Sequence, residues 1–194
     1  ISAAPTVSRA EELADFSTDR RVLLLSFMAL IIGMVSALVA YILMWLIAAI
    51  TNLAFYQRFS SASVVPQGNH LGYWVILIPI IGAVVIGLMA RFGSEKIRGH
   101  GIPEALDAIL LGRSFISLKV AILKPLSSAI SIGTGGPFGA EGPIIMTGGA
   151  FGSIFAQLFH LSAAERKTLL VAGAAGGMAA IFDTPVAAVL LAVE

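Results

Sequence analysis

Long apolar runs without a charged side chain dominate the first half of the chain. No charged residue lies between Arg21 and Arg58, and His70 is the one residue between Arg58 and Arg91 that could carry charge. Each interval exceeds the roughly 20 apolar residues that a helix needs to cross a bilayer. The first half of the chain therefore belongs in a membrane, as two hydrophobic spans.

The two spans are expected over residues 22–52 and 73–90. The first is long enough to tilt in the bilayer, and the second contains Pro79 as a tolerated kink. Residues 57–70 between the spans are rich in turn-forming side chains, so they form a loop.

The hydrophobic segments of the second half are short and are separated by glycine, proline or charged residues. They fall at residues 102–112, 118–133, 142–158, 166–181 and 185–194. Such segments are typical of discontinuous transporter helices, whose non-helical backbone is tolerated only where it lines a cavity or is buried in protein. Gly148 with Gly152, and Gly173 with Gly177, have the GxxxG spacing of closely crossing helices, which is weak evidence in so glycine-rich a region.

The composition supports a membrane protein and excludes several other classes. Of the 194 residues, 58% are hydrophobic and 12% charged, and the mean hydropathy is +0.95, which is too apolar for a soluble domain of this size. The net charge of +1 gives no indication of a nucleic-acid partner, and the absence of cysteine excludes disulfides and thiol chemistry. The chain begins at Ile1 with a polar, acidic stretch, so we expect a fragment rather than a signal peptide.

Basic residues indicate the orientation in the membrane. They flank the outer ends of the two predicted spans, as Arg20, Arg21, Arg91, Lys96 and Arg98. The loop between the spans carries only Arg58, so the positive-inside rule predicts that residues 1–21 form a cytoplasmic N-terminal segment and that the loop is external. Trp45 and Tyr56 suit the far membrane interface of the first span.

One carboxylate, Glu141, stands alone in the glycine-rich sequence GTGGPFGAEGPIIMTGG, residues 133–149. It is the only Asp, Glu, Lys or Arg from Pro125 to Ala164, and a lone acid at membrane depth is costly enough to suggest a function. The four preceding glycines exclude a regular helix there, whereas Pro143 suits the first turn of a new helix. We expect Glu141 at a helix start, where unpaired N–H donors and the positive dipole end form an anion site.

A second break repeats this arrangement at residues 99–104, GHGIPE. Glycines are followed by Pro103 at the expected first helical turn and by Glu104 near the positive helix end. Two helix N-termini can therefore point at one target.

The motifs GHGIPE, GGPFGAEGP and GAAGGMAAIFDTPVAAVLLAVE, in this order and spacing, resemble the CLC family of chloride channels and chloride/proton antiporters. The likeness covers roughly Val22 to Glu194. It implies an all-α, polytopic membrane protein with tilted, discontinuous helices, of which residues 22–194 are the first of two inverted repeats. It also implies chloride transport through a pore lined by helix N-termini, in a voltage- or pH-gated channel or an antiporter.

The resemblance further implies partners and a location. We expect a homodimer with a separate pore in each subunit, completed by a second half that is missing from this chain. No organic cofactor or metal is expected, chloride and protons are the expected transported ions, and the expected location is the inner membrane of a prokaryote.

Residue roles follow from the same resemblance. Glu141 matches the family's gating glutamate, whose carboxylate occupies the outer anion site and moves away when it is protonated or displaced. The residues that match anion-binding backbone are Gly139, Ala140, Gly142 and Pro143 around it, and His100, Gly101, Ile102 and Pro103 at the inner site. His100 replaces the family's serine and Ala140 its arginine, which leaves the anion preference open. Glu194 matches the first of a glutamate pair, and residues 182–185 match the start of the last helix of this half.

Two other function classes share some of these features. A broken-helix transporter of another family shares the glycine breaks, but not GHGIPE combined with GAEGP. For an enzyme, the sequence offers no convincing active site. Phe138 stands where the dinucleotide-binding motif GxGxxG needs its third glycine, and the helix break between His100 and Glu104 separates potential metal ligands.

The remaining charged residues are expected to have structural roles. Arg113, Lys119 and Lys124 are expected to snorkel at an interface, and Glu104 and Asp107 to stabilise their helix through its dipole. The last group, expected in a short surface turn, is His160, Glu165, Arg166 and Lys167.

Overall fold

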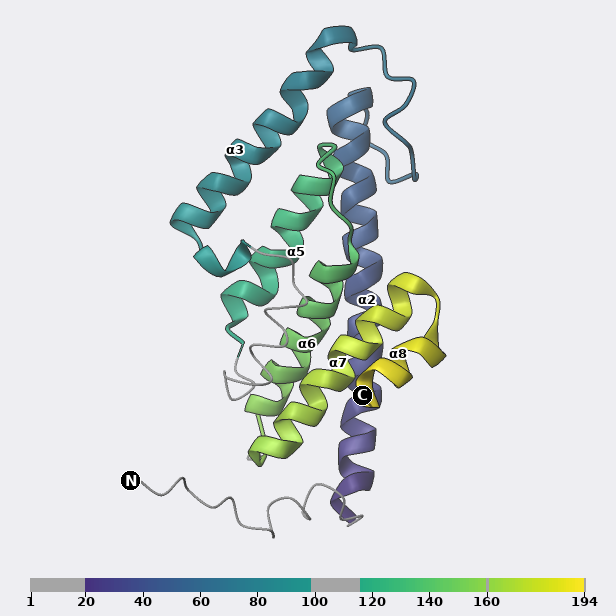
Figure 1. The fold of residues 1–194 in the computed structure, drawn as a ribbon, viewed down its shortest axis with the longest axis vertical. Coiled ribbons are helices and arrows are strands. Elements are labelled where there is room, and N and C mark those ends of the chain that lie inside the picture. Colours follow the sequence, from purple (N-terminus) through teal and green to yellow (C-terminus); the bar gives the residue numbers. More distant parts are fainter. Residues whose placement is uncertain (1–19, 99–115, 160, 194) are drawn as a thin grey trace, which may run out of the picture.

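The computed structural model describes residues 20–98, 116–159 and 161–193, and every regular element within these ranges is a helix. In chain order the elements are α2 (Arg20–Tyr56), η1 (Gly72–Ile76), α3 (Leu77–Phe92), η2 (Glu95–Ile97), α5 (Leu118–Gly133), α6 (Glu141–Gln157), α7 (Ala163–Phe182) and α8 (Pro185–Val193). Figure 1 shows α2, α5, α6 and α7 packed side by side, with α3 leaning away from them. The predicted all-α fold class is confirmed.

Most of the predicted helices are present, with small differences at their ends. Helix α5 has the predicted bounds, α6 and α7 differ from prediction by one to three residues at each end, and α8 begins at the predicted residue. Pro79 is the third residue of α3, which follows η1 directly, so its missing N–H costs no helical hydrogen bond. The predicted segment 102–112 lies outside the described residues.

The two predicted spans leave their apolar surfaces largely uncovered. Arg21–Tyr56 and Gly72–Phe92 are long and apolar enough to cross a membrane, and only 17% and 11% of their most apolar stretches are buried. A core helix of a soluble protein passes the same test of length and composition, but it buries that stretch. Surfaces of this kind require lipid or further protein around them.

Helix α6 lies at the centre of the packing. Its residues Ile144 and Ala156 pack against α2, where they join Leu43 and Ile32 in two separate clusters. On its other side, Met146 and Ala150 contact buried residues of α5 and α7. Contacts with three helices therefore fix the position at which α6 begins.

Paired glycines bring α6 and α7 into backbone contact. A Cβ atom on Gly148 would collide with the carbonyl oxygen of Gly173, and one on Gly173 would collide with that of Gly148. Further along the crossing, a Cβ on Gly152 would lie 2.9 Å from the carbonyl carbon of Leu169. The close crossing predicted from the two GxxxG pairs is confirmed, because no larger side chain fits at these positions.

Candidate anion site at the start of helix α6

The chain reverses direction between α5 and α6 through a glycine-rich loop. Gly133 packs so closely on α2 that a Cβ there would lie 2.6 Å from Cγ2 of Ile50. Gly135 has a φ of +88°, a left-handed conformation that glycine adopts at little cost, and the N–H of Gly136 donates to the carbonyl of Ser131 at 2.8 Å. The predicted break in helical structure is confirmed, and glycine is what permits both the tight packing and the turn.

Glu141 is the first residue of α6, as predicted. The first helical hydrogen bond runs from the N–H of Ile144 to the carbonyl of Ala140, at 3.1 Å, and Ala140 supplies no side-chain cap. Pro143 has no N–H to satisfy. Within the described part of the chain, no acceptor bonds the N–H groups of Ala140, Glu141 and Gly142. These unpaired donors and the helix dipole make the start of α6 suitable for an anion.

The Glu141 side chain folds back over the loop that precedes it. It is half-buried, and a Cβ atom on Gly139 would collide with its carboxylate oxygen Oε2 and lie 2.7 Å from its Cδ. No donor among the described residues forms a hydrogen bond with this carboxylate. Glycine at position 139 therefore leaves the space that the carboxylate occupies, and no hydrogen bond from the described residues holds it there.

The start of α6 lies part of the way along α2 rather than at its end. Ala140 and Ile144 pack against Leu43 and Ile47 of α2, which precede the last residue of that helix, Tyr56, by 13 and 9 residues. At 1.5 Å per residue this is about 14–20 Å. Figure 1 shows the loop after α5 running back along α2 before α6 begins. The unpaired N–H groups are thus displaced from the end of α2 toward its middle.

The end of α7 also reaches this region. Ile181 packs with Ala140 and Ile144, and Gly177 approaches so closely that a Cβ on it would lie 2.9 Å from the carbonyl oxygen of Ile144. Asp183 then ends α7 in a left-handed conformation, with a φ of 54°, and α8 begins at Pro185. The start of a helix after residues 182–184 was predicted.

The described residues include one of the two segments predicted to form the anion site. Gly139, Ala140, Glu141, Gly142 and Pro143 lie together at the start of α6. The other predicted anion-binding residues, His100, Gly101, Ile102 and Pro103, lie outside the described residues, as do Glu104, Asp107, Arg113, His160 and Glu194. Convergence of two helix N-termini on one anion stays a prediction.

The prediction that Lys124 snorkels at an interface is wrong. Its side chain is 1% exposed within α5, and it has an interaction partner inside the protein. Lys119, one turn earlier, is exposed as expected. The helical spacing could have predicted the burial of Lys124, because it lies on the same helix face as Val120, Ala121 and Ser127, which are all buried.

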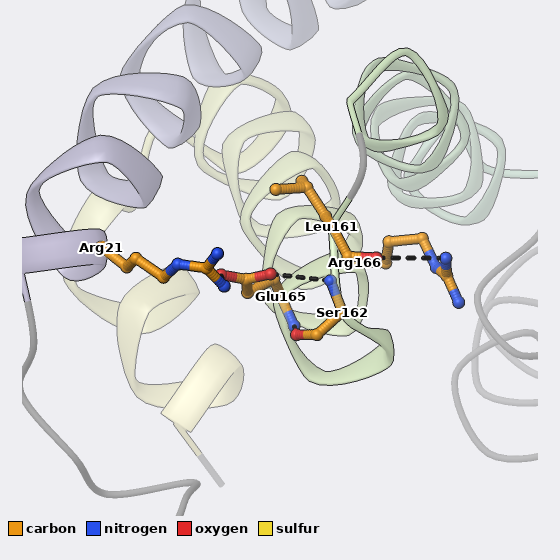
Figure 2. A network of polar contacts seen from close by, with 5 residues as sticks. All are labelled: Arg21, Leu161, Ser162, Glu165 and Arg166. Carbon is orange, nitrogen blue, oxygen red and sulfur yellow. Dashed lines mark hydrogen bonds and ion pairs between the residues drawn. The ribbon is translucent and has the colours of Figure 1, made fainter.

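Glu165 is also more deeply placed than the predicted surface turn allowed. Its side chain is 13% exposed and forms a capping box with Ser162: Oε2 accepts from the Ser162 N–H at 2.7 Å, and the Glu165 N–H donates to Ser162 Oγ at 3.3 Å. Figure 2 shows Arg21 reaching Glu165 from the start of α2, with Nη1 to Oε1 at 3.4 Å. These contacts join the starts of α2 and α7.

The same contacts set the charge state of Glu165. The hydrogen bond from the Ser162 backbone is the largest effect and lowers the pKa of this carboxyl below its ordinary value. Burial opposes it, and the Ser162 hydroxyl and Arg21 add smaller lowering effects. Arg166 beside it donates from Nη1 to the carbonyl of Leu161 at 3.3 Å (Figure 2).

Comparison with known proteins points to one family. Residues 81–194, more than half of the chain, match the family described as voltage gated chloride channel. The H(+)/Cl(-) exchange transporter ClcA of Vibrio campbellii is 38% identical over 131 residues, which cover 66% of this chain and 28% of that protein. The ClcA exchange transporter of Salmonella typhi is 30% identical over 181 residues, covering 91% of this chain and 37% of that protein.

A third relative has a different name. The putative chloride channel protein ClcB-like of Ralstonia nicotianae is 24% identical over 148 residues, covering 74% of this chain and 34% of that protein. The chain thus spans about a third of the length of these curated relatives, all of which are named as transporters or channels.

Discontinuous helices, exposed apolar spans and these matches together define an integral membrane protein. The chain belongs to the voltage gated chloride channel family, the CLC family.

Proposed function

We propose that the chain supplies the outer anion site and the gate of a chloride-transporting membrane protein. The observation that carries the proposal is the start of α6, where three N–H groups have no acceptor among the described residues and one carboxylate folds over the preceding loop. Such a helix end attracts anions because unpaired donors and the positive dipole end meet there.

Glu141 acts as the gate because its carboxylate and a permeant anion compete for the same positive helix end. When Glu141 is ionised, its charge substitutes for the anion and keeps it out. Protonation removes that charge, so the attraction of the carboxylate to the helix end is lost and an anion can take the site. The lack of a side chain on Gly139 leaves room for the carboxylate in this position. Anion flux therefore rises as the pH falls.

Coupled exchange of chloride for protons is the favoured mode of transport, because two of the relatives above are named as proton/chloride exchangers and Glu141 can carry a proton. A voltage- or pH-gated channel is the alternative, which the name of the Ralstonia relative favours. In either mode, residues 100–103 contribute the inner anion site, and no cofactor or metal takes part.

The whole protein is proposed to be a homodimer in the inner membrane of a prokaryote. Residues 22–194 form the first inverted repeat, and a second repeat closes the pore. Residues 1–21 lie in the cytoplasm, since the basic residues flank the spans on that side.

Chloride efflux from liposomes that contain the full-length protein tests the proposal, with an external pH probe recording proton movement. Glu141→Ala is compared with wild type, and Glu95→Ala is the control because Glu95 is an exposed acid in η2, outside α6. We expect chloride-driven proton movement in the wild type and in the control, and chloride flux without proton movement in Glu141→Ala. Chloride flux that is never coupled to protons would establish a channel, and absence of chloride flux from the wild type would refute the proposal.

A further inference from the structure

The loop that follows α2 folds back along that helix and is held there by side chains. Gln57 ends α2 in a left-handed conformation, with a φ of 52°, which turns the chain back. Asn52 is fully buried, and its Nδ2 donates to the carbonyls of Ala48 and Ala62 at 2.9 and 2.8 Å. The hydroxyl of Tyr56 donates to the carbonyl of Val65 at 2.6 Å. Residues 61–65 therefore form a fixed wall beside α2.

A cavity of about 290 Å³ lies between this wall and α2. The α2 side of the cavity, here called its floor, is mostly apolar, and the loop side, here called its rim, consists of Ser61, Ser63 and Val64. The floor includes Tyr41, Met44, Trp45 and Ala48. The first three are 70%, 48% and 50% exposed, so this part of α2 is open to its surroundings.

The level of the cavity along α2 matches the boundary between hydrocarbon and headgroups. Tyr41 and Trp45 follow Arg21, which marks the first membrane surface, by 20 and 24 residues. This is about 30–36 Å of helix at 1.5 Å per residue, and the hydrocarbon core is roughly 30 Å thick. Tyrosine and tryptophan are enriched at such boundaries. The cavity therefore lies near the end of the hydrocarbon layer, with aromatic side chains typical of that boundary in its lining.

A single cation, Arg58, is bonded to the residue that anchors the rim. Nε of Arg58 donates to Oδ1 of Asn52 at 2.6 Å, and the guanidinium carbon lies 5.2 Å from the centre of the Tyr56 ring. Arg58 is exposed, and no carboxylate among the described residues forms an ion pair with it. Because Asn52 also holds Ala62, which lies between Ser61 and Ser63, Arg58 and the rim share one anchor. The remaining guanidinium N–H groups are available to an anionic group there.

We propose that this cavity binds a phospholipid of the leaflet that surrounds the C-terminal end of α2. The phosphate pairs with Arg58 and accepts hydrogen bonds from Ser61 and Ser63, while an acyl chain lies against Met44 and Ala48. Charge complementarity favours this occupant: Arg58 is the one permanently charged side chain between Arg21 and Arg91, and Asn52 bonds both Arg58 and the loop that lines the cavity. The phosphate and an acyl chain of one phospholipid thus both meet groups of matching polarity.

Native mass spectrometry of the full-length protein in mild detergent, titrated with phosphatidylglycerol, tests the site. Arg58→Gln removes the charge, and Ala48→Phe reduces the space on the floor without altering the carbonyl that Asn52 uses. Arg91→Gln is the matched control, because Arg91 is also exposed and also lies beside an aromatic ring, that of Phe92 at 5.8 Å. We expect the tightest lipid to bind about tenfold more weakly in both test variants and unchanged in the control.

Three results would overturn the proposal. Equal lipid binding in Arg58→Gln and Arg91→Gln would show that the cation does not hold the lipid. Absence of a tightly bound lipid in the wild type would mean that another segment of the protein covers the cavity. Equal competition by inorganic phosphate would show an anion site that does not use the apolar floor. Unchanged melting temperatures of the variants establish that their folds are intact.

Discussion

Replacement of Gly139 by alanine tests the proposed gate without altering the glutamate itself. The added Cβ would collide with Oε2 of Glu141 and would lie 2.7 Å from Cδ and 3.1 Å from Oε1. All three atoms are at the far end of a flexible side chain, so the carboxylate moves and the backbone stays. Gly139 does not have a positive φ, so alanine introduces no backbone strain. Gly139→Ala therefore displaces the carboxylate from the space that it occupies.

The size of the effect follows from the interaction that is lost. A carboxylate at a partly buried helix N-terminus is stabilised by about 0.3–2 kcal/mol. If about 2 kcal/mol of this stabilisation is lost, the ratio of unblocked to blocked sites rises about 30-fold, because each 1.36 kcal/mol changes the ratio tenfold. We expect chloride flux at neutral pH to rise toward the level that the wild type reaches only in acid.

Chloride efflux from liposomes, measured from acidic to neutral pH, reports this change directly. Gly87→Ala is the matched control, since Gly87 is helical and no atom lies within 4 Å of a Cβ built there. The control should keep the wild-type pH dependence. If Gly139→Ala keeps the wild-type dependence and the wild-type flux at neutral pH, the carboxylate beside Gly139 is not the gate.

Other substitutions test the packing and the cap. Gly148→Val places a branched side chain against the carbonyl of Gly173 and should destabilise the protein by more than 3 kcal/mol, measured as a large fall in melting temperature, whereas Gly33→Val, where nothing lies within 4 Å, should change it little. Glu165→Gln removes the charge from the capping box but can keep its hydrogen bond, so it should cost about 0.3–1 kcal/mol at neutral pH. Because folding lowers the pKa of Glu165, its contribution is fully present above the unfolded pKa and is lost as the pH falls through the folded pKa. The wild type and Glu165→Gln should therefore converge in stability in acid, and a constant difference at every pH would contradict the assignment.

Local glycine and proline residues were sufficient to predict the helix ends around the site. Glycines mark the end of α5 and Pro143 marks the first turn of α6, and both signals act within a few residues. Burial was harder to predict because it depends on which distant helix covers a side chain. Lys124 was misplaced for this reason, since the helices packed around α5 come from distant parts of the chain.

Tertiary contacts also explain what the sequence left undecided. The GxxxG spacing identifies two candidate faces, but only the packed structure shows that Gly148 meets Gly173. The cavity beside α2 depends on the hydrogen bond from Asn52 to Ala62, which joins residues ten positions apart through a loop of mixed composition. No periodic pattern of apolar residues encodes a fold-back of this kind.

The glycine crossing between α6 and α7 has a mechanical consequence. Backbone touches backbone at Gly148, Gly152 and Gly173, so no layer of side chains exists there that could change rotamer and let one helix slide over the other. The two helices therefore move as one rigid unit, and the start of α6 is held in place at one end of it. Movement at that end is then left to the Glu141 side chain, whose rotation needs far less energy than a shift of either helix.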